Sequence, residues 1–167
     1  MRRMTTLLHW PPPRAWTSSH LPPEKYITAL LGQVQPALAS PSPAHQRAAY
    51  QALAVSAEGC MESIRTKYLN NFLQILATGI KHEHPAVRNA ALYMLGQFSE
   101  FIQPEISNHA PDILPVLLQY LDRALDSQAP GASSAPATVS RIFYALETFC
   151  ENLELKLIPH LEHIMTR

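Results

Sequence analysis

Apolar residues recur every three or four positions along much of the chain, a spacing typical of helices that bury one side. Two stripes belong to a first type of helix: Leu69, Phe72, Leu73, Leu76 and Ile80, and Ile113, Leu114, Leu117, Leu118 and Leu121. Two others belong to a second type: Leu92, Leu95, Phe98 and Ile102, and Phe143, Leu146 and Phe149. The pattern therefore predicts a protein built from helices.

One of these helical segments occurs three times. Residues 48–58, AAYQALAVSAE, align with residues 90–100, AALYMLGQFSE, at an offset of 42 residues. Residues 141–151, RIFYALETFCE, follow after 51 more residues and align in the same register. The longer second offset is explained by a flexible insertion at about residues 126–137, which are rich in Ser, Ala, Pro and Gly.

A unit of two antiparallel helices with a period of 42 residues fits HEAT or armadillo repeats. Prolines lie just before the second helices, where a missing N–H costs least: Pro41 and Pro43, then Pro85, then Pro130 and Pro136. Pro36 and Pro115 fall inside first helices and should kink or split them. Small residues would let neighbouring helices approach closely, namely Ala48, Ala49, Ala90 and Ala91.

We therefore expect an all-α fold, an α-α superhelix of the HEAT/armadillo solenoid type, with about three helical hairpins and the start of a fourth. The predicted solenoid segment is 21–167, with units at about 22–59, 60–102 and 103–153 and a partial unit at 154–167. An ordinary helical bundle is the alternative. Residues 1–20 match nothing that follows, so we expect a disordered or unrelated leader. A transit peptide is the alternative there, although three consecutive prolines would interrupt its helix.

Composition narrows the class of protein further. Hydrophobic residues make up 47% and charged residues 16%, which is too apolar for a disordered chain. Three arginines lie within residues 1–20, which hold no acid, so the rest of the chain is mildly acidic and nucleic acid is not an expected partner. Cys60 and Cys150 form no disulfide framework, and a reducing compartment is expected. No apolar run of about 18 residues exists, so we expect no membrane insertion.

Three phrases resemble consecutive HEAT repeats from the central part of karyopherin-β (importin-β) family nuclear import receptors. They are AAYQALAVSAEGC at 48–60, HPAVRNAALYMLGQFSEFIQPEI at 84–106 and YALETFCENL at 144–153, and the resemblance extends over residues 22–167. It implies a receptor in the cytoplasm and nucleus that carries basic cargo, such as ribosomal proteins and histones, past nucleoporins through the nuclear pore. Ran-GTP is implied as a partner of the parent family rather than of this chain, because the amino-terminal repeats that bind it lie outside the resemblance.

The repeat also predicts a binding surface. Glu58, Glu100 and Glu151 occupy the same place near the end of each second helix, so stacked repeats would align them as a ladder of carboxylates. In the family that the chain resembles, second helices line the concave side, and an acidic ladder there would suit basic cargo. We add Glu147, one turn earlier on the third of these helices. The plainer interpretation is that these glutamates are solvated surface positions or helix caps.

A polar pair, Arg88 and Asn89, opens the second helix of the middle unit, where such a pair is expected to bond between neighbouring repeats. The sequence His82-Glu83-His84 offers zinc-binding side chains, but histidines two residues apart do not share one side of a helix, which favours a surface turn. No nucleophile motif or phosphate-binding loop is present. We expect a protein-binding segment without catalytic residues, cofactor or metal, the alternative being a HEAT scaffold or adaptor with no role in transport.

Overall fold

The computed structural model describes residues 22–126, 136–151, 153 and 158, and within them the chain is helical and has no strand. In chain order the elements are α1 (Pro23–Ala39), α2 (Pro43–Ser63), the π-helical turn η2 (Ile64–Tyr68), α3 (Leu69–Ile80), α4 (Pro85–Phe101), the 3-10 turn η3 (Glu105–His109), α5 (Ala110–Asp126) and α6 (Pro136–Glu151). The predicted leader at 1–20, and most of the predicted insertion at 126–137 and partial unit at 154–167, lie outside the described residues. None of the described helices is long and apolar enough to cross a membrane.

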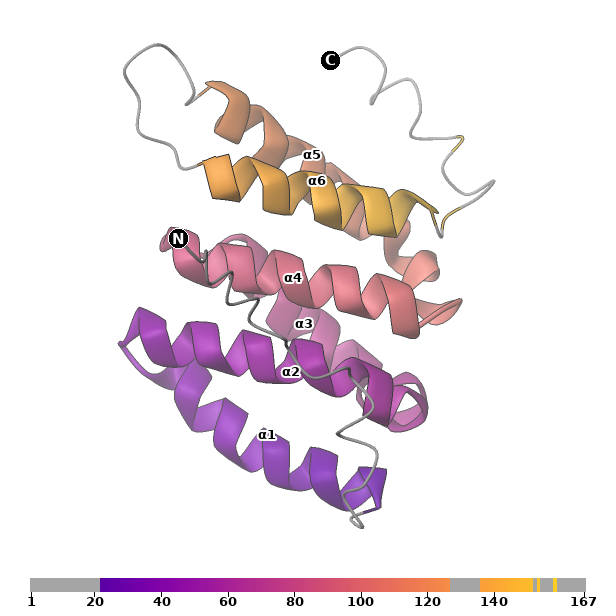
Figure 1. Ribbon diagram of the computed structural model, residues 1–167. Helices are drawn as coiled ribbons and strands as arrows, with labels where there is room; N and C mark the ends of the chain where they lie inside the picture. The colour runs from indigo at the N-terminus through magenta and orange to yellow at the C-terminus, as the bar shows by residue number, and fades with distance from the viewer. Residues whose placement is uncertain (1–21, 127–135, 152, 154–157, 159–167) are drawn as a thin grey trace, which may run out of the picture.

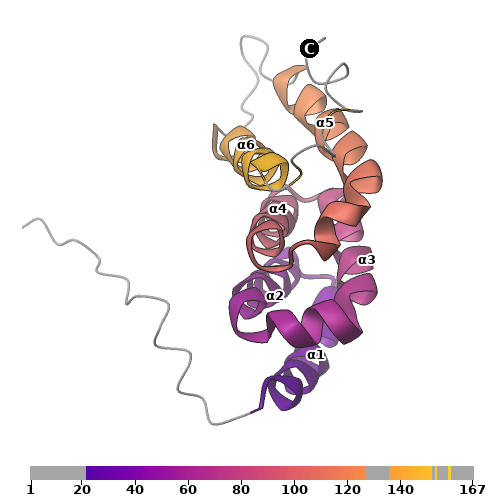
Figure 2. The ribbon, with the colours of Figure 1, turned by 90° about the vertical axis from the view of Figure 1, so that its right-hand side faces the viewer.

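The helices form two layers. Figures 1 and 2 show α1, α3 and α5 in one layer and α2, α4 and α6 in the other, with each hairpin stacked on the one before. Within the second layer α2 packs closely on α4 and α4 on α6, whereas α3 and α5 touch only sparsely. Neighbouring helices lie closest on the inner side of a curved stack, so the second layer forms the concave side. The expected all-α superhelix is confirmed.

Prolines mark the starts of the second helices as the sequence predicts. The helices α2, α4 and α6 begin at Pro43, Pro85 and Pro136. The two internal prolines do not split their helices, since α1 continues through Pro36 and α5 through Pro115. A proline removes one backbone hydrogen bond of the helix, and the flanking apolar side chains, among them Val34, Leu114 and Leu117, stay buried and hold both helices against their neighbours.

The core follows the predicted stripes with two corrections. Phe72 of α3 and Phe98 of α4 are fully buried, and their ring centroids lie 5.8 Å apart. Phe143 was expected in the stripe of α6, but it is 52% exposed. Each residue turns an α-helix by about 100°, and Phe143 lies on the side away from the buried stripe of Ile142, Ala145 and Phe149. For the same reason Ala48 is exposed on α2, whereas Ala49, Ala90 and Ala91 are buried at helix contacts.

Candidate functional site

The exposed surface of α2, α4 and α6, which we call the second-helix face, carries a regular set of side chains. On α2 the exposed residues Arg47, Gln51, Val55 and Glu58 follow one another every three or four positions. A helix of 3.6 residues per turn places such residues in one stripe along its axis. The stripe therefore runs from a basic residue near the start of α2 to an acidic residue further along.

The neighbouring second helices repeat this arrangement in part, because both carry an exposed glutamate near the end and α6 also has an exposed arginine near its start. On α4, the stripe that holds Asn89 and Tyr93 reaches the exposed Glu100 in the last turn. On α6, the exposed Arg141 lies near the start and the exposed Glu151 is the last residue. Because α2, α4 and α6 run in the same direction in the stack (Figure 1), their starts gather at one edge of the second-helix face and their ends at the other.

The far edge of this face is acidic. Glu58, Glu100 and Glu151 are all exposed, and within the described part of the chain none of them belongs to an ion pair. The carboxyl end of a helix carries a partial negative charge, so the helix dipoles do not stabilise the negative charges of Glu100 and Glu151. Glu147 is also exposed and lies four residues before Glu151, about 40° around α6, so the two share one side of that helix. The structure thus leaves all four predicted glutamates exposed on the second helices.

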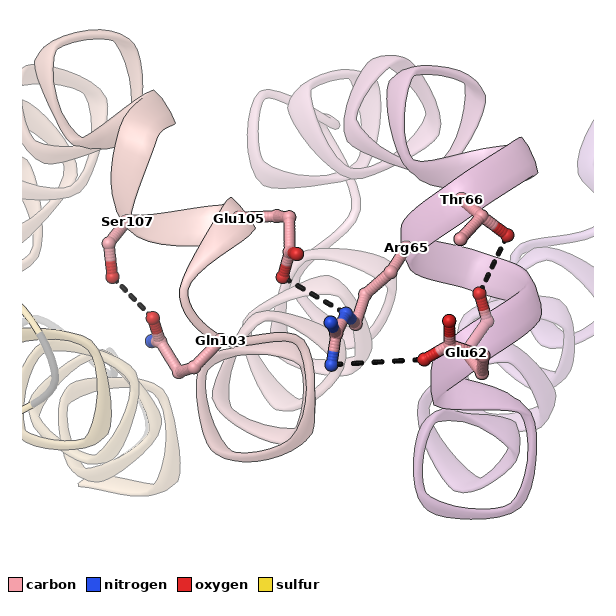
Figure 3. A network of polar contacts seen from close by, with 6 residues as sticks. All are labelled: Glu62, Arg65, Thr66, Gln103, Glu105 and Ser107. Atoms are coloured by element: carbon pink, nitrogen blue, oxygen red, sulfur yellow. Dashed lines mark hydrogen bonds and ion pairs between the residues drawn. The ribbon is translucent and has the colours of Figure 1, made fainter.

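Other acidic side chains nearby are paired with cations. Arg65 of η2 lies 3.2 Å from Glu105 of η3, Nε to Oε2, and 3.9 Å from Glu62 on α2. Figure 3 shows this network together with the hydrogen bond from Ser107 to Gln103. At the preceding junction of repeats, Lys67 of η2 pairs with a glutamate at the start of α1. The Arg65–Glu105 and Lys67–Glu24 pairs join successive repeats, and the glutamates of the second-helix face take part in none of these ion pairs.

Arg88 connects three parts of the fold. Its Nε donates a hydrogen bond of 2.7 Å to the hydroxyl of Tyr120 on α5, and its Cζ lies 5.1 Å from the centre of that ring. One of its terminal nitrogens donates 2.7 Å bonds to the carbonyls of His82 and Glu83 in the turn before α4. Asn89 is half-buried and faces the groove between α2 and α4.

The His82-Glu83-His84 segment is a turn that caps α4. Nδ1 of His84 accepts a hydrogen bond from the backbone N–H of Ala86 at 3.2 Å, and Nδ1 of His82 accepts one from the N–H of His84 at 3.0 Å. One nitrogen of each imidazole ring is therefore occupied by a hydrogen bond from the backbone. Among the described residues, no group of three or more His, Cys, Asp or Glu side chains is placed to hold a metal ion.

Neither cysteine is placed to act as a nucleophile. Burial raises the pKa of the Cys60 thiol and of the Cys150 thiol. The thiolate is the reactive form of cysteine, so both side chains are held in their inert form. They serve as small apolar groups within the helix packing.

The opposite, first-helix side of the stack holds an apolar groove between α3 and α5, of about 410 Å³. Its apolar lining comes from Leu73, Leu76, Ala77, Ile80, Ile113 and Val116. Asn70, Gln74, His109 and Asp112 add polar atoms to its lining. The sparse contact between α3 and α5 leaves this groove open.

Sequence reasoning missed the residues at the start of the second-helix face. Arg47, Gln51 and Val55 line one groove with Asn89, Tyr93 and Arg141, and the guanidinium of Arg141 lies over the ring of Tyr93 at 5.7 Å. On α2 the sequence did contain a feature that could have revealed these residues, namely the spacing of four between Arg47, Gln51 and Val55. No feature of the sequence predicts that residues of α2 and α6 line the same groove, because their proximity depends on how three repeats stack.

Paired helices in two curved layers, with loops at the edges, define an α-helical repeat protein of the HEAT class. A family model described as a HEAT-like repeat matches residues 43–98, which span α2, η2, α3 and most of α4. The chain is 44% identical to "Importin-4" of Homo sapiens and 42% identical to "Importin-4" of Mus musculus, in each case over 102 residues. It is 29% identical over 104 residues to "Probable importin subunit beta-4" of Schizosaccharomyces pombe.

These alignments cover 61%, 61% and 62% of this chain and only 9%, 9% and 10% of the relatives. The chain thus corresponds to a small part of the length of the curated relatives that it matches. Together with the HEAT-like repeat, these similarities confirm the expected resemblance of the chain to a segment of karyopherin-β family proteins.

Proposed function

We propose that this chain is a protein-binding segment of a nuclear transport receptor and that the acidic edge of its second-helix face holds basic segments of cargo. The observation that carries the proposal is the placement of Glu58, Glu100 and Glu151 at equivalent, exposed positions on three successive helices. None of the three is neutralised by an ion pair within the described part of the chain. Glu147, one turn before Glu151 on α6, is a further contact.

The spacing of these carboxylates suggests how a cargo segment would lie. Packed helices are about 8–10 Å apart, so the glutamates of adjacent helices are separated by about that distance across the face. A peptide in the polyproline II conformation rises about 3.1 Å per residue and places every third side chain on the same side. A segment that crosses the helices would therefore present a lysine or arginine to each carboxylate at every third residue. Ribosomal proteins and histones are cargo of the required charge.

The test is binding of a fluorescent peptide with lysine at every third residue to the full chain, measured by anisotropy at low and moderate salt. The variant Glu58→Gln/Glu100→Gln should bind about fivefold to tenfold more weakly, because each exposed charge pair contributes about 0.2–1 kcal/mol. The matched control is Glu83→Gln/Asp112→Asn, which removes two exposed carboxylates elsewhere on the chain. Equal weakening by both variants would show that bulk charge, and not the acidic edge, holds the peptide.

The apolar groove between α3 and α5 supports a second contact of the same transport function. It has room for an apolar side chain on the first-helix side of the stack, which suits the phenylalanines of nucleoporin repeats. Ala77 is an exposed member of its lining, so Ala77→Glu would place a charge in the groove without disturbing the core. Loss of binding to a phenylalanine-glycine repeat peptide in this variant alone would support the contact.

Ran-GTP dependence belongs in this proposal to the longer receptors of the family and not to this chain. We propose that the chain acts in the cytoplasm and nucleus, without a catalytic step, and that Arg88 and Asn89 hold its repeats in register. A scaffold or adaptor with no role in transport remains the competing function. It would be favoured if neither the lysine peptide nor the phenylalanine-glycine peptide bound.

A further inference from the structure

The starts of the second helices form a groove whose chemistry is opposite to that of the acidic edge. The groove has a volume of about 700 Å³, and we call it the basic groove. Its walls come from all three second helices: Arg47, Gln51 and Val55 of α2, Ala86, Asn89, Ala90 and Tyr93 of α4, and Arg141 of α6.

The charge of its lining is the first property of the basic groove that indicates which ligand it binds. Among the residues that the structure describes, the ionised side chains that line the basic groove are Arg47 and Arg141, and none of these lining residues is a carboxylate. Both arginines are exposed, and within the residues that the structure describes neither has an acidic partner in ion-pair range. The groove therefore favours an anionic ligand.

The second property is a fixed geometry around apolar surface. The guanidinium of Arg141 lies over the ring of Tyr93 at 5.7 Å, which holds its planar fork in one place. Val55 is 59% exposed in the same groove and offers apolar surface to a ligand. A ligand that satisfies the groove has carboxylates and an apolar side chain, since arginine binds carboxylates through two parallel hydrogen bonds.

We propose that the basic groove binds an extended acidic peptide segment, with carboxylates at Arg47 and Arg141 and an apolar side chain against Val55 and Tyr93. The axes of α2 and α6 are about 16–20 Å apart, since two helix spacings separate them. An extended peptide of about five or six residues covers that distance. This partner differs from the basic cargo of the acidic edge, so the second-helix face has two binding regions of opposite charge.

The experiment uses the full chain and a fluorescent peptide of glutamates around one central leucine, with a peptide of glutamines around leucine for comparison. The glutamate peptide should bind and the glutamine peptide should not. The variant Arg47→Gln/Arg141→Gln should weaken binding about tenfold, which corresponds to about 1.4 kcal/mol. The control Lys25→Gln/Lys81→Gln removes two exposed cations outside the groove and should leave the affinity unchanged.

Three outcomes would overturn the proposal: equal binding of both peptides, an unchanged affinity in the arginine variant, or tighter binding of a single-stranded oligonucleotide of the same charge. The last would show that the groove attracts polyanions through their phosphates rather than acidic peptides. Far-UV circular dichroism of each variant checks that the helices remain. The variant Glu58→Gln/Glu100→Gln should bind the glutamate peptide as well as the parent chain or better, so failure here is distinguishable from failure of the basic cargo proposal.

Discussion

The ring of Tyr144 on α6 lies against the backbone of Gly96 on α4, so closely that a β-carbon added to Gly96 would be 2.4 Å from Cε1 of the ring. A second glycine–tyrosine contact joins a first helix to a second helix. A β-carbon on Gly79 of α3 would be 2.4 Å from Cζ of Tyr50 on α2. In both places a glycine allows an aromatic ring to fill the space between two helices of the stack.

Gly96→Ala should destabilise the chain by about 1–3 kcal/mol, because the added methyl group forces Tyr144 or α6 to move. Urea unfolding followed by circular dichroism measures the effect. Gly59→Ala is the matched control, since no atom lies within 4 Å of its added β-carbon. That substitution should raise stability by up to about 1 kcal/mol through helix propensity alone. Equal stabilities of the two variants would contradict the close contact.

The contact between Gly96 and Tyr144 shows where prediction from the sequence stopped. The repeat aligned Gly96 with Ala54 and Tyr144 with Tyr93, and so it placed each residue correctly on a second helix. Which residues meet across α4 and α6 depends on the rotation and register of two helices in different repeats. Local spacing contains neither quantity.

Tyr50 should make the fold sensitive to alkaline pH. Burial raises the pKa of Tyr50 from 10.0 to about 12. Below pH 10 the phenol is protonated in both the folded and the unfolded chain, and its contribution to stability is fully present. Between pH 10 and about 12 only the unfolded chain loses this proton, so stability falls as pH rises, by up to about 1.4 kcal/mol per pH unit.

The variant Tyr50→Phe isolates this contribution. It removes the titrating group and also the 2.9 Å hydrogen bond from the hydroxyl to the carbonyl of Ile75, which costs about 1 kcal/mol at neutral pH. Melting temperatures measured from pH 7 to pH 11 should fall less steeply above pH 10 in the variant than in the parent chain. Parallel curves would show that Tyr50 titrates normally in the folded state.

Arg88 should tolerate no conservative replacement. Arg88→Lys loses the planar group that reaches Tyr120 and two backbone carbonyls at once, and we expect a loss of about 2 kcal/mol. Tyr120→Phe removes only the bond from Nε and should cost about 1 kcal/mol. Urea unfolding of both single variants and of the double variant checks this. If the two losses simply added, the bond between the side chains would contribute nothing.

The candidate site was predictable in part. The equivalent positions of Glu58, Glu100 and Glu151 followed from the alignment, because exposed residues in matched registers end on the same edge of a stack. The basic groove could not be predicted from the repeat alignment. Arg47 aligns with Asn89 and Arg141 with Ala90, so its two cations occupy different positions of the repeat. Only the stacked helices bring them to one groove.

The ion pair between Arg65 and Glu105 should contribute little to stability although it joins two repeats. Both side chains are about one third exposed and lie 3.2 Å apart, Nε to Oε2. A pair in contact with solvent is screened and must also restrain two long side chains, so we expect a coupling energy of at most about 1 kcal/mol. A double-mutant cycle of Arg65→Gln and Glu105→Gln, repeated at low and high salt, measures it. A larger coupling that did not change with salt would mean that water is excluded from the pair and that it fixes the angle between the repeats.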